Sequence, residues 1–157
     1  MDAETLGALA RLVRKERVAS LGTLRQGAPF VSLVAFLPQD DFGAFHLRVS
    51  RLAWHTQDMA REARVSLAIA ETDDGRTDPQ TLMRVALRCE ARPLEGGAAE
   101  LERLKRAWLA RFPASAVTFE LADFAFWRLA VRDARFVAGL GRTHNLAPAD
   151  LAAAARL

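Results

Sequence analysis

The feature that most limits the fold of this chain is a change of hydrophobic period near residue 17. Before that point, apolar residues from Leu6 to Val13 recur at helical spacing and predict a helix over residues 3–16. After it, apolar and polar residues alternate, which is typical of strands with one buried face. The chain is therefore expected to hold one N-terminal helix followed by a mainly antiparallel β domain with peripheral helices.

The alternation divides the rest of the chain into short segments separated by turn residues. Strands are predicted over residues 17–24, 30–37, 44–49, 65–70, 82–92, 119–131 and 134–140. The first three are expected to form an antiparallel meander, the last two are expected to meet at a turn at Arg132-Asp133, and residues 72–80 are expected to form an exposed loop. Helices are expected from about Arg51 to Glu62, after Gly96-Gly97 and from Pro148 onward. Several antiparallel strands in so short a chain predict a closed or nearly closed barrel, because closure removes exposed edges.

Composition narrows the functional classes. The length of 157 residues suits a single domain over residues 1–157, and no apolar run approaches the roughly 18 residues of a membrane span. Cys89 is the one cysteine, which excludes an intramolecular disulfide and a cysteine-rich metal site, and a cytoplasmic location is expected. The net charge is +3 and the arginines are scattered, so a small anionic ligand is a better expectation than nucleic acid.

The junction at Ser50-Arg51 is the most informative stretch. A strand ends there, a hydroxyl residue follows, and an arginine opens the next helix. Free backbone N–H groups at a helix start favour anions, so this junction predicts a phosphate pocket, and His55 lies one turn later on the same side. The alternative is that Ser50 only caps the helix, that Arg51 is a solvated side chain, and that His55 is structural.

Two further polar positions follow the same logic. His144 comes soon after Gly139-Leu140-Gly141, where glycines let backbone approach a ligand or simply make a turn. Asp123, before a predicted strand, either accepts a hydrogen bond from a ligand or caps that strand. The sequence has no zinc-type histidine pair, so no metal site is expected. It also lacks a glycine-rich dinucleotide motif, a phosphate loop and a nucleophile elbow, which disfavours the enzymes that depend on them.

Taken together, the segments resemble a known family. Residues 21–24, 27–32, 50–56 and 64–67 look like the FMN-binding split barrels related to pyridoxamine 5′-phosphate oxidase. Residues 121–124 and 137–143 are most similar to the HugZ/HutZ heme-utilisation branch. The resemblance implies a six-stranded antiparallel Greek-key split barrel, a homodimer with FMN at the interface, and a small-molecule substrate.

The resemblance also implies roles for particular residues. Ser50 and Arg51 would hold the FMN phosphate, and Ser32 occupies a strand position where the oxidase has a phosphate-contacting arginine. Leu52 replaces a phosphate-binding lysine. The remaining implied flavin contacts are Arg84 from the partner subunit, His46 beside the isoalloxazine, and Trp127.

For the heme branch, Asp123 matches an aspartate near the iron ligand, but the C-terminal tail lacks the ligating histidine. His144 is the candidate substitute, and Arg142-Thr143-His144 faintly echoes the oxidase's substrate motif. Three functions therefore stay open: an FMN-dependent oxidoreductase, a heme-binding or heme-degrading protein, and a non-catalytic flavin-binding barrel.

Overall fold

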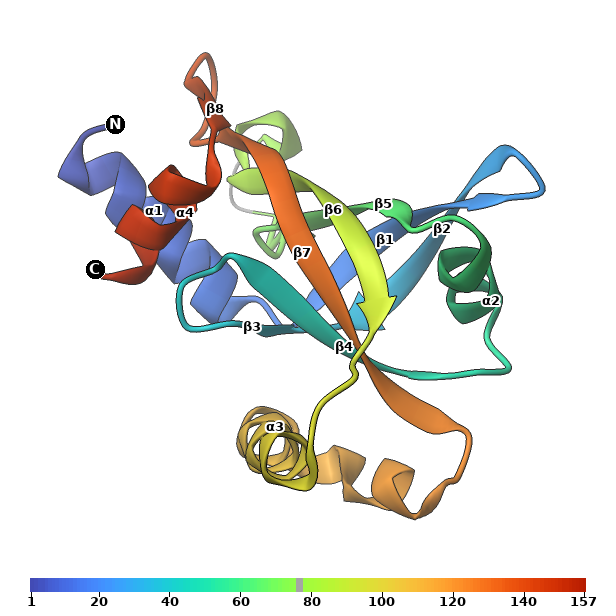
Figure 1. Cartoon of the computed structure of the whole chain (residues 1–157). Coiled ribbons are helices and arrows are strands. Elements are labelled where there is room, and N and C mark those ends of the chain that lie inside the picture. Colours follow the sequence, from blue (N-terminus) through green and yellow to red (C-terminus); the bar gives the residue numbers. More distant parts are fainter. Residues whose placement is uncertain (76–77) are drawn as a thin grey trace.

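The structure is a computed structural model that describes residues 1–75 and 78–157 (Figure 1). Residues 76 and 77, within the predicted loop 72–80, lie outside the described part. The helices are α1 Ala3–Lys15, α2 Trp54–Arg61, α3 Ala98–Arg111 and α4 Pro148–Ala155, with 3-10 segments η1 Pro79–Thr81 and η2 Pro113–Glu120. The N-terminal helix is confirmed, and Asp2 caps it by accepting a hydrogen bond from the Thr5 backbone N–H.

The described residues form one antiparallel sheet of eight strands. The strands are β1 Val18–Arg25, β2 Ala28–Ala35, β3 Leu37–Pro38, β4 Ala44–Ser50, β5 Arg64–Ala70, β6 Arg84–Pro93, β7 Phe124–Val137 and β8 Thr143–Leu146. Their order is β2-β1-β5-β6-β7-β4-β3, and β8 pairs with β7. This is a mainly antiparallel half-barrel with peripheral helices, so the predicted class holds, but the expected count of six strands is wrong.

The predicted meander of the first three strands holds only in part: the hairpin of the first two is confirmed, but only Leu37 and Pro38 pair with β4. β1 pairs with β2 and β5, whereas β4 pairs with β7 and with the short strand β3. The chain crosses from one edge of the sheet to the other at Phe36, between β2 and β3, and this crossing curls the sheet. Alternation along one strand shows which face is buried, but it does not show which strand lies alongside.

The turn predicted at Arg132-Asp133 is a β-bulge inside one long strand. In the pairing of β6 with β7, Arg88 opposes Asp133 and Cys89 opposes Val131, which leaves Arg132 without a partner. The extra residue shifts the alternation, so the buried positions change from 129 and 131 to 134 and 136. The break in phase that suggested a turn is the signature of this bulge.

Two other boundaries differ from the prediction. Residues 113–120 form η2, so β7 begins at Phe124 and not at 119, because Pro113 opens a helical turn. Residues 143–146 form an additional strand, β8, whereas the last strand predicted from the sequence ended at residue 140.

Two cores hold the domain together. The main core fills the concave side of the sheet and is closed at one end by α1 and α4, which lie together in Figure 1. The smaller core lies on the other side of β4 and β7, where Leu104, Trp108 and Phe112 of the α3 region meet Phe126. Residues that are fully buried in the main core include Phe36, Phe45, Leu67, Leu87 and Phe136.

Arg111 ties the smaller core to the closed end of the half-barrel. Its guanidinium donates to the carbonyl oxygens of Phe36 (3.1 Å), Arg14 (3.0 Å) and Val13 (3.4 Å), and also to that of Glu16. Three of these carbonyls belong to the last turn of α1 and its C-cap, where no helical partner exists for them. Burial lowers the pKa of Arg111.

We expect Arg111→Ala to lower the free energy of unfolding by roughly 2–4 kcal/mol, because several charge-assisted hydrogen bonds are lost and buried carbonyls remain unsatisfied. Urea unfolding followed by circular dichroism measures the change. Arg106→Ala is the matched control, since Arg106 lies on the same helix, is 68% exposed and contacts Glu102 at 3.9 Å; it should shift stability by at most about 0.5 kcal/mol. Equal effects of the two variants would contradict this role.

Candidate functional site

One side of the half-barrel carries exposed side chains on its central strands, and we call it the open face. It consists of the outward-pointing residues Val18, Ser20, Gly22, Val31, Leu33, Ser66, Ala68, Ala86 and Arg88 of β1, β2, β5 and β6. Their neighbours along each strand point into the main core, as the strict alternation of β5 shows. Central strands with small and aliphatic residues turned to solvent are unusual in a lone domain and indicate a binding surface.

The open face carries small side chains in the middle and aliphatic ones at one edge. Across the strands, Leu33, Ser20, Ala68 and Ala86 occupy successive register positions, and Gly22 lies in the adjacent row beside Ser66. A Cβ atom at Gly22 would lie 2.5 Å from the Ser66 Oγ, so glycine leaves room for the Ser66 hydroxyl on this face. At the β2 edge, Val31 is 65% exposed and Leu33 is 73% exposed.

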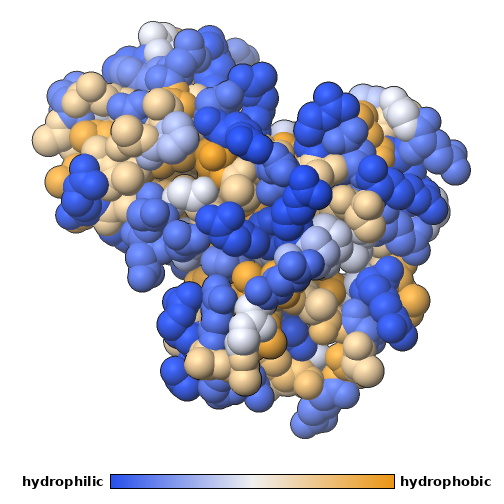
Figure 2. All heavy atoms as spheres, in the orientation of Figure 1, coloured by the Kyte–Doolittle hydropathy of each residue, from blue (hydrophilic) through white to orange (hydrophobic). Residues whose placement is uncertain are grey.

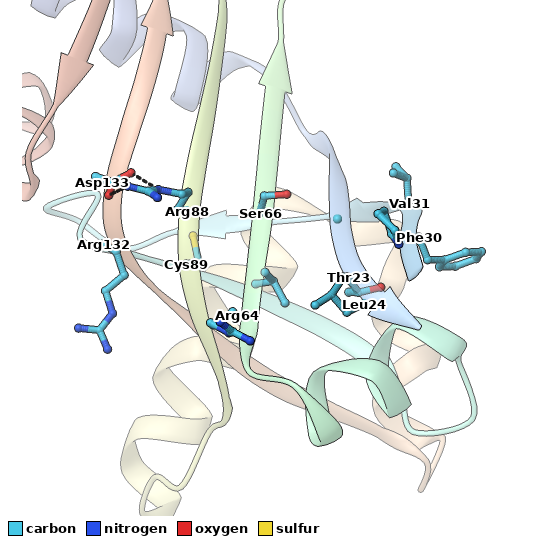
Figure 3. A pocket seen from close by; sticks show the side chains of 13 residues that line it. Thr23, Leu24, Phe30, Val31, Arg64, Ser66, Arg88, Cys89, Arg132 and Asp133 are labelled. Carbon is cyan, nitrogen blue, oxygen red and sulfur yellow. Dashed lines mark hydrogen bonds and ion pairs between the residues drawn. The ribbon is translucent and has the colours of Figure 1, made fainter. Parts of the chain in front are cut away.

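Arginines line the opposite edge of the open face. The Arg88 Nε donates to the Asp133 Oδ1 at 2.7 Å in a two-pronged ion pair, which lowers the pKa of Asp133. Figure 3 shows this pair on one side of the hollow, Phe30 and Val31 on the other, and Ser66 between them. Arg64 and Arg132 also line the hollow. Each of these arginines is paired with a carboxylate of the chain, Arg64 with Glu62 and Arg132 with Glu90, so an acidic ligand would have to share or displace these partners.

An aromatic group stands at the rim of the hollow. The Arg25 guanidinium lies 3.9 Å from the centre of the Trp54 ring, and Phe30 lies 5.6 Å from the same ring. Arg25 also pairs with the buried Asp58 at 3.0 Å, and Asp58 accepts a hydrogen bond from the Thr23 hydroxyl at 3.1 Å. These contacts hold α2 against β1 and keep Trp54 in place.

The Ser50-Arg51 junction differs from the prediction. α2 begins at Trp54 with Ala53 as its N-cap, so Ser50 does not cap the helix. The Ser50 hydroxyl donates to the Asp123 carboxylate and accepts from the Leu52 N–H at 3.1 Å. The backbone N–H of Arg51 donates to the Asp123 carbonyl at 2.8 Å, and the Arg51 side chain is exposed. The structure thus brings Ser50, Arg51 and Asp123 together and places a carboxylate beside the hydroxyl.

The other predicted flavin contacts are dispersed. Ser32 is half-buried on β2, and Trp127 is buried in the main core. Arg84 is exposed on β6 and donates to the carbonyls of Gln80 and Leu82 at 3.1 and 3.0 Å. His46 is buried on β4 on the side that faces α3, and burial lowers its pKa to about 4. Among the heme or substrate candidates, Arg142 donates to the Ala138 carbonyl at 3.0 Å.

The three histidines share one property. His46 Nδ1, His55 Nε2 and His144 Nε2 are each buried without a hydrogen-bond partner in the described structure. The His144 ring stacks on Phe136 with ring centres 6.5 Å apart. Each of these nitrogens is turned into the protein, so binding an exogenous group through one of them would require the side chain to move. Within residues 1–75 and 78–157, no cluster of three or more potential metal ligands is present.

Sequence analysis missed the residues that define the open face. It assigned no role to Val31, Leu33 or Arg88, and it considered Asp133 only as a turn residue. The available signal was a pair of exposed apolar positions in β2 and a run of small residues at alternate positions of β5. These positions indicate a binding surface only once the strand register is known, because the register brings them together on one face.

The fold and the open face define the class of split-barrel proteins. The profile of the CREG beta-barrel family matches residues 2–152, and the chain belongs to this family. The resemblance to split barrels of the heme-utilisation and pyridoxamine phosphate oxidase type is thereby confirmed. No curated protein matches the sequence.

Solved structures agree with this placement. A heme-binding protein from Mycobacterium smegmatis is 29% identical, with a TM-score of 0.84 over 98% of this chain, which spans 62% of that protein's length. Campylobacter jejuni ChuZ is 17% identical with a TM-score of 0.83, and the match covers 96% of this chain and 62% of the ChuZ chain. A Clostridium acetobutylicum protein of the pyridoxinephosphate oxidase family is 13% identical with a TM-score of 0.72, over 96% and 99% of the two chains. The last two likenesses concern the fold alone.

A bilayer span requires a long apolar helix, and none of the helices in the part of the chain that the structure describes meets that requirement.

The buried His46 makes stability depend on pH. Its side chain is 4% exposed, and burial lowers its pKa from 6.5 to about 4, so the folded state favours the neutral imidazole. As pH falls from about 6.5 to 4, His46 is protonated in the unfolded chain but stays neutral in the folded protein. The free energy of unfolding therefore decreases by up to about 1.4 kcal/mol per pH unit. Urea unfolding at pH 7, 6 and 5 measures this slope. His46→Gln should show a shallower slope in that window, and parallel slopes would contradict the assignment.

Proposed function

We propose that the protein forms a homodimer through the open face and binds heme along it. The observation that carries this proposal is the patch of small side chains between an aliphatic edge and a line of arginines. A porphyrin is a flat apolar ring with two carboxylates at one edge, and the patch complements both features. The exposed Val18, Val31 and Leu33 favour association with a second copy, because an exposed apolar surface is more stable when covered.

The residues present fit the ring and its carboxylates. Gly22, Ser66 and Ala68 leave room for a planar group, and Arg64, Arg88 and Arg132 line the same hollow. Arginine binds carboxylates in a two-pronged geometry, as Arg88 already does with Asp133. Bound heme would supply an iron centre, while the chain's own residues would position the ring and exclude water from it. His144 remains the proposed iron ligand near the C-terminus, provided that its ring leaves Phe136.

The Ser50 junction supports heme over FMN as the first candidate. The hydroxyl proposed to hold a phosphate already donates to the Asp123 carboxylate, which would repel a phosphate bound to the same hydroxyl. Leu52 in place of a lysine removes one further cation from the junction. The similarity to the Mycobacterium smegmatis heme-binding protein, at 29% identity over 98% of this chain, points the same way.

We expect Leu33→Lys to convert the dimer to a monomer and to weaken hemin binding at least tenfold, because Leu33 is 73% exposed at the aliphatic edge of the open face. Sedimentation velocity measures the oligomeric state, and a Soret titration with hemin measures the affinity. Val117→Lys is the matched control, since Val117 is 60% exposed on η2 and lies outside the open face. A wild-type protein that is monomeric, or a hemin affinity unaffected by Leu33→Lys, would remove the proposal.

An FMN-dependent oxidoreductase is the second candidate, because of the Arg51 side chain. Arg51 is exposed at the start of the turn that leads into α2, where the helix dipole favours an anion. The protein would hold the phosphate of FMN there and the flavin ring at the dimer interface. The remaining alternative, a barrel without catalytic function, would take up FMN without turnover or bind neither group.

If FMN is the cofactor, Arg51→Ala should weaken its binding by roughly ten- to a hundredfold, the loss expected for one charge-assisted contact. Asp123→Asn should strengthen it, because the change removes a negative charge beside the phosphate. Quenching of flavin fluorescence on titration measures both affinities. Arg61→Ala, at the far end of α2, is the control. An FMN affinity that does not respond to Arg51→Ala would exclude this phosphate site.

A further inference from the structure

A second cleft lies away from the open face, between α3, η2 and the adjoining ends of β4 and β7. Its lining includes Arg48, Leu94, Leu101, Lys105, Phe119 and Phe124. In Figure 1 these elements form the lower end of the molecule, and Figure 2 shows apolar side chains there among hydrophilic ones. None of the residues assigned above to heme or FMN lines this cleft. It therefore needs its own explanation.

Arg48 is the unusual residue of the cleft. It points away from the main core, because its neighbours Leu47 and Val49 on β4 point into it. Its guanidinium lies 3.7 Å from the centre of the Phe119 ring and 5.2 Å from that of Phe126. Its Nε and Nη2 donate to the Thr118 hydroxyl and carbonyl at 3.3 and 2.9 Å. Both acceptors are neutral, so the charge of this half-buried group is not balanced by them.

Burial without a counter-ion is costly for a cation, and burial accordingly lowers the pKa of Arg48. Arg48 takes no part in the ion pairs found among the described residues, all of which join other side chains. An arginine stacked on aromatic rings keeps its position without a carboxylate, and it can still offer a free N–H group to an anion. The arrangement is that of a prepared anion-binding group.

Lys105 supplies a second cation at the same ring. Its ammonium lies 5.3 Å from the centre of Phe119, and it too is outside the ion pairs of the described chain. The nearby Glu102 also lines the cleft, but its carboxylate faces Arg106 at 3.9 Å. The cleft therefore presents two cations and one acid that is turned toward another arginine. Around them lie Leu94, the 41% exposed Leu101 and Phe124, which form an apolar wall.

We propose that this cleft binds a small monocarboxylate with an apolar body, such as a medium-chain fatty acid or an aromatic acid. The carboxylate lies between the Arg48 guanidinium and the Lys105 ammonium, and the apolar body packs on Phe119, Phe124 and Leu101. The two cations supply the complementary charge and the aromatic wall the complementary surface. This site is independent of the cofactor at the open face.

The test is a calorimetric titration of the full chain with octanoate and with benzoate, beside the neutral analogues octanol and benzamide. Wild-type protein should bind at least one carboxylate and should prefer it to its neutral analogue by at least tenfold. Arg48→Met, which keeps an apolar side chain in the stack, should weaken carboxylate binding at least tenfold. Lys105→Met, a change at a half-buried position of α3, should weaken it severalfold even if Arg48→Met fails to fold. Arg103→Met, an exposed arginine of the same helix that neither lines the cleft nor pairs with Glu102, should leave the affinity unchanged.

Three results would overturn the proposal. The first is no heat of binding with either carboxylate up to about 10 mM. The second is equal affinity for a carboxylate and its neutral analogue, which would mean that the cations do not take part. The third is the same loss of affinity in Arg103→Met as in Lys105→Met, which would indicate a general effect of charge on α3. Hemin and FMN titrations of these variants should match wild type, so failure here does not bear on the open face.

Discussion

The half-barrel depends on the short crossing at Phe36, where the chain leaves β2 at one edge of the sheet and joins β4 as β3 at the other. Phe36 is fully buried and packs edge-on against Phe45 with ring centres 5.7 Å apart, so the crossing is fixed from inside. Arg111 fixes it from outside by donating to the Phe36 carbonyl and to the end of α1. The crossing is therefore held by packing on one side and by charge-assisted hydrogen bonds on the other. It joins the two edges of the sheet, which pairing between neighbouring strands alone would leave open.

This curvature divides the sheet into surfaces with different roles. The concave side is filled by the main core, and the outer side of β4 and β7 is covered by α3 and the smaller core. The outer side of β1, β2, β5 and β6 is left with Val31 and Leu33 in solvent, which accounts for the proposal of a second copy there. The bulge at Arg132 contributes to the same face, because it turns Asp133 toward Arg88 at the edge of the hollow.

The choice between heme and flavin rests on how one junction is hydrogen-bonded. The pattern of a strand, Ser50, Arg51 and a helix indicates an anion pocket when read along the chain. Asp123, some seventy residues later, reaches the Ser50 hydroxyl and supplies the opposite charge. The arginines lie instead on β5, β6 and β7, around a hollow that Gly22 and Ser66 also line. The ligand that this protein can bind therefore depends on which segments, distant in the sequence, lie together in the fold, and not on a single motif.

The sequence by itself determined the local elements: the helix at residues 3–15, the strands with their buried faces, and a barrel built from them, because hydrophobic period and turn residues act over a few positions. It also indicated the family, because several short segments that resemble split barrels occur in the order found in that family. Only the tertiary structure decided that β1 lies between β2 and β5, that Arg132-Asp133 is a bulge, that Ser50 faces Asp123, and that Arg48 stacks on Phe119 without a counter-ion. Strand partners and side-chain pairs depend on packing between residues far apart in the chain, and alternation along one strand is the same whichever strand lies beside it.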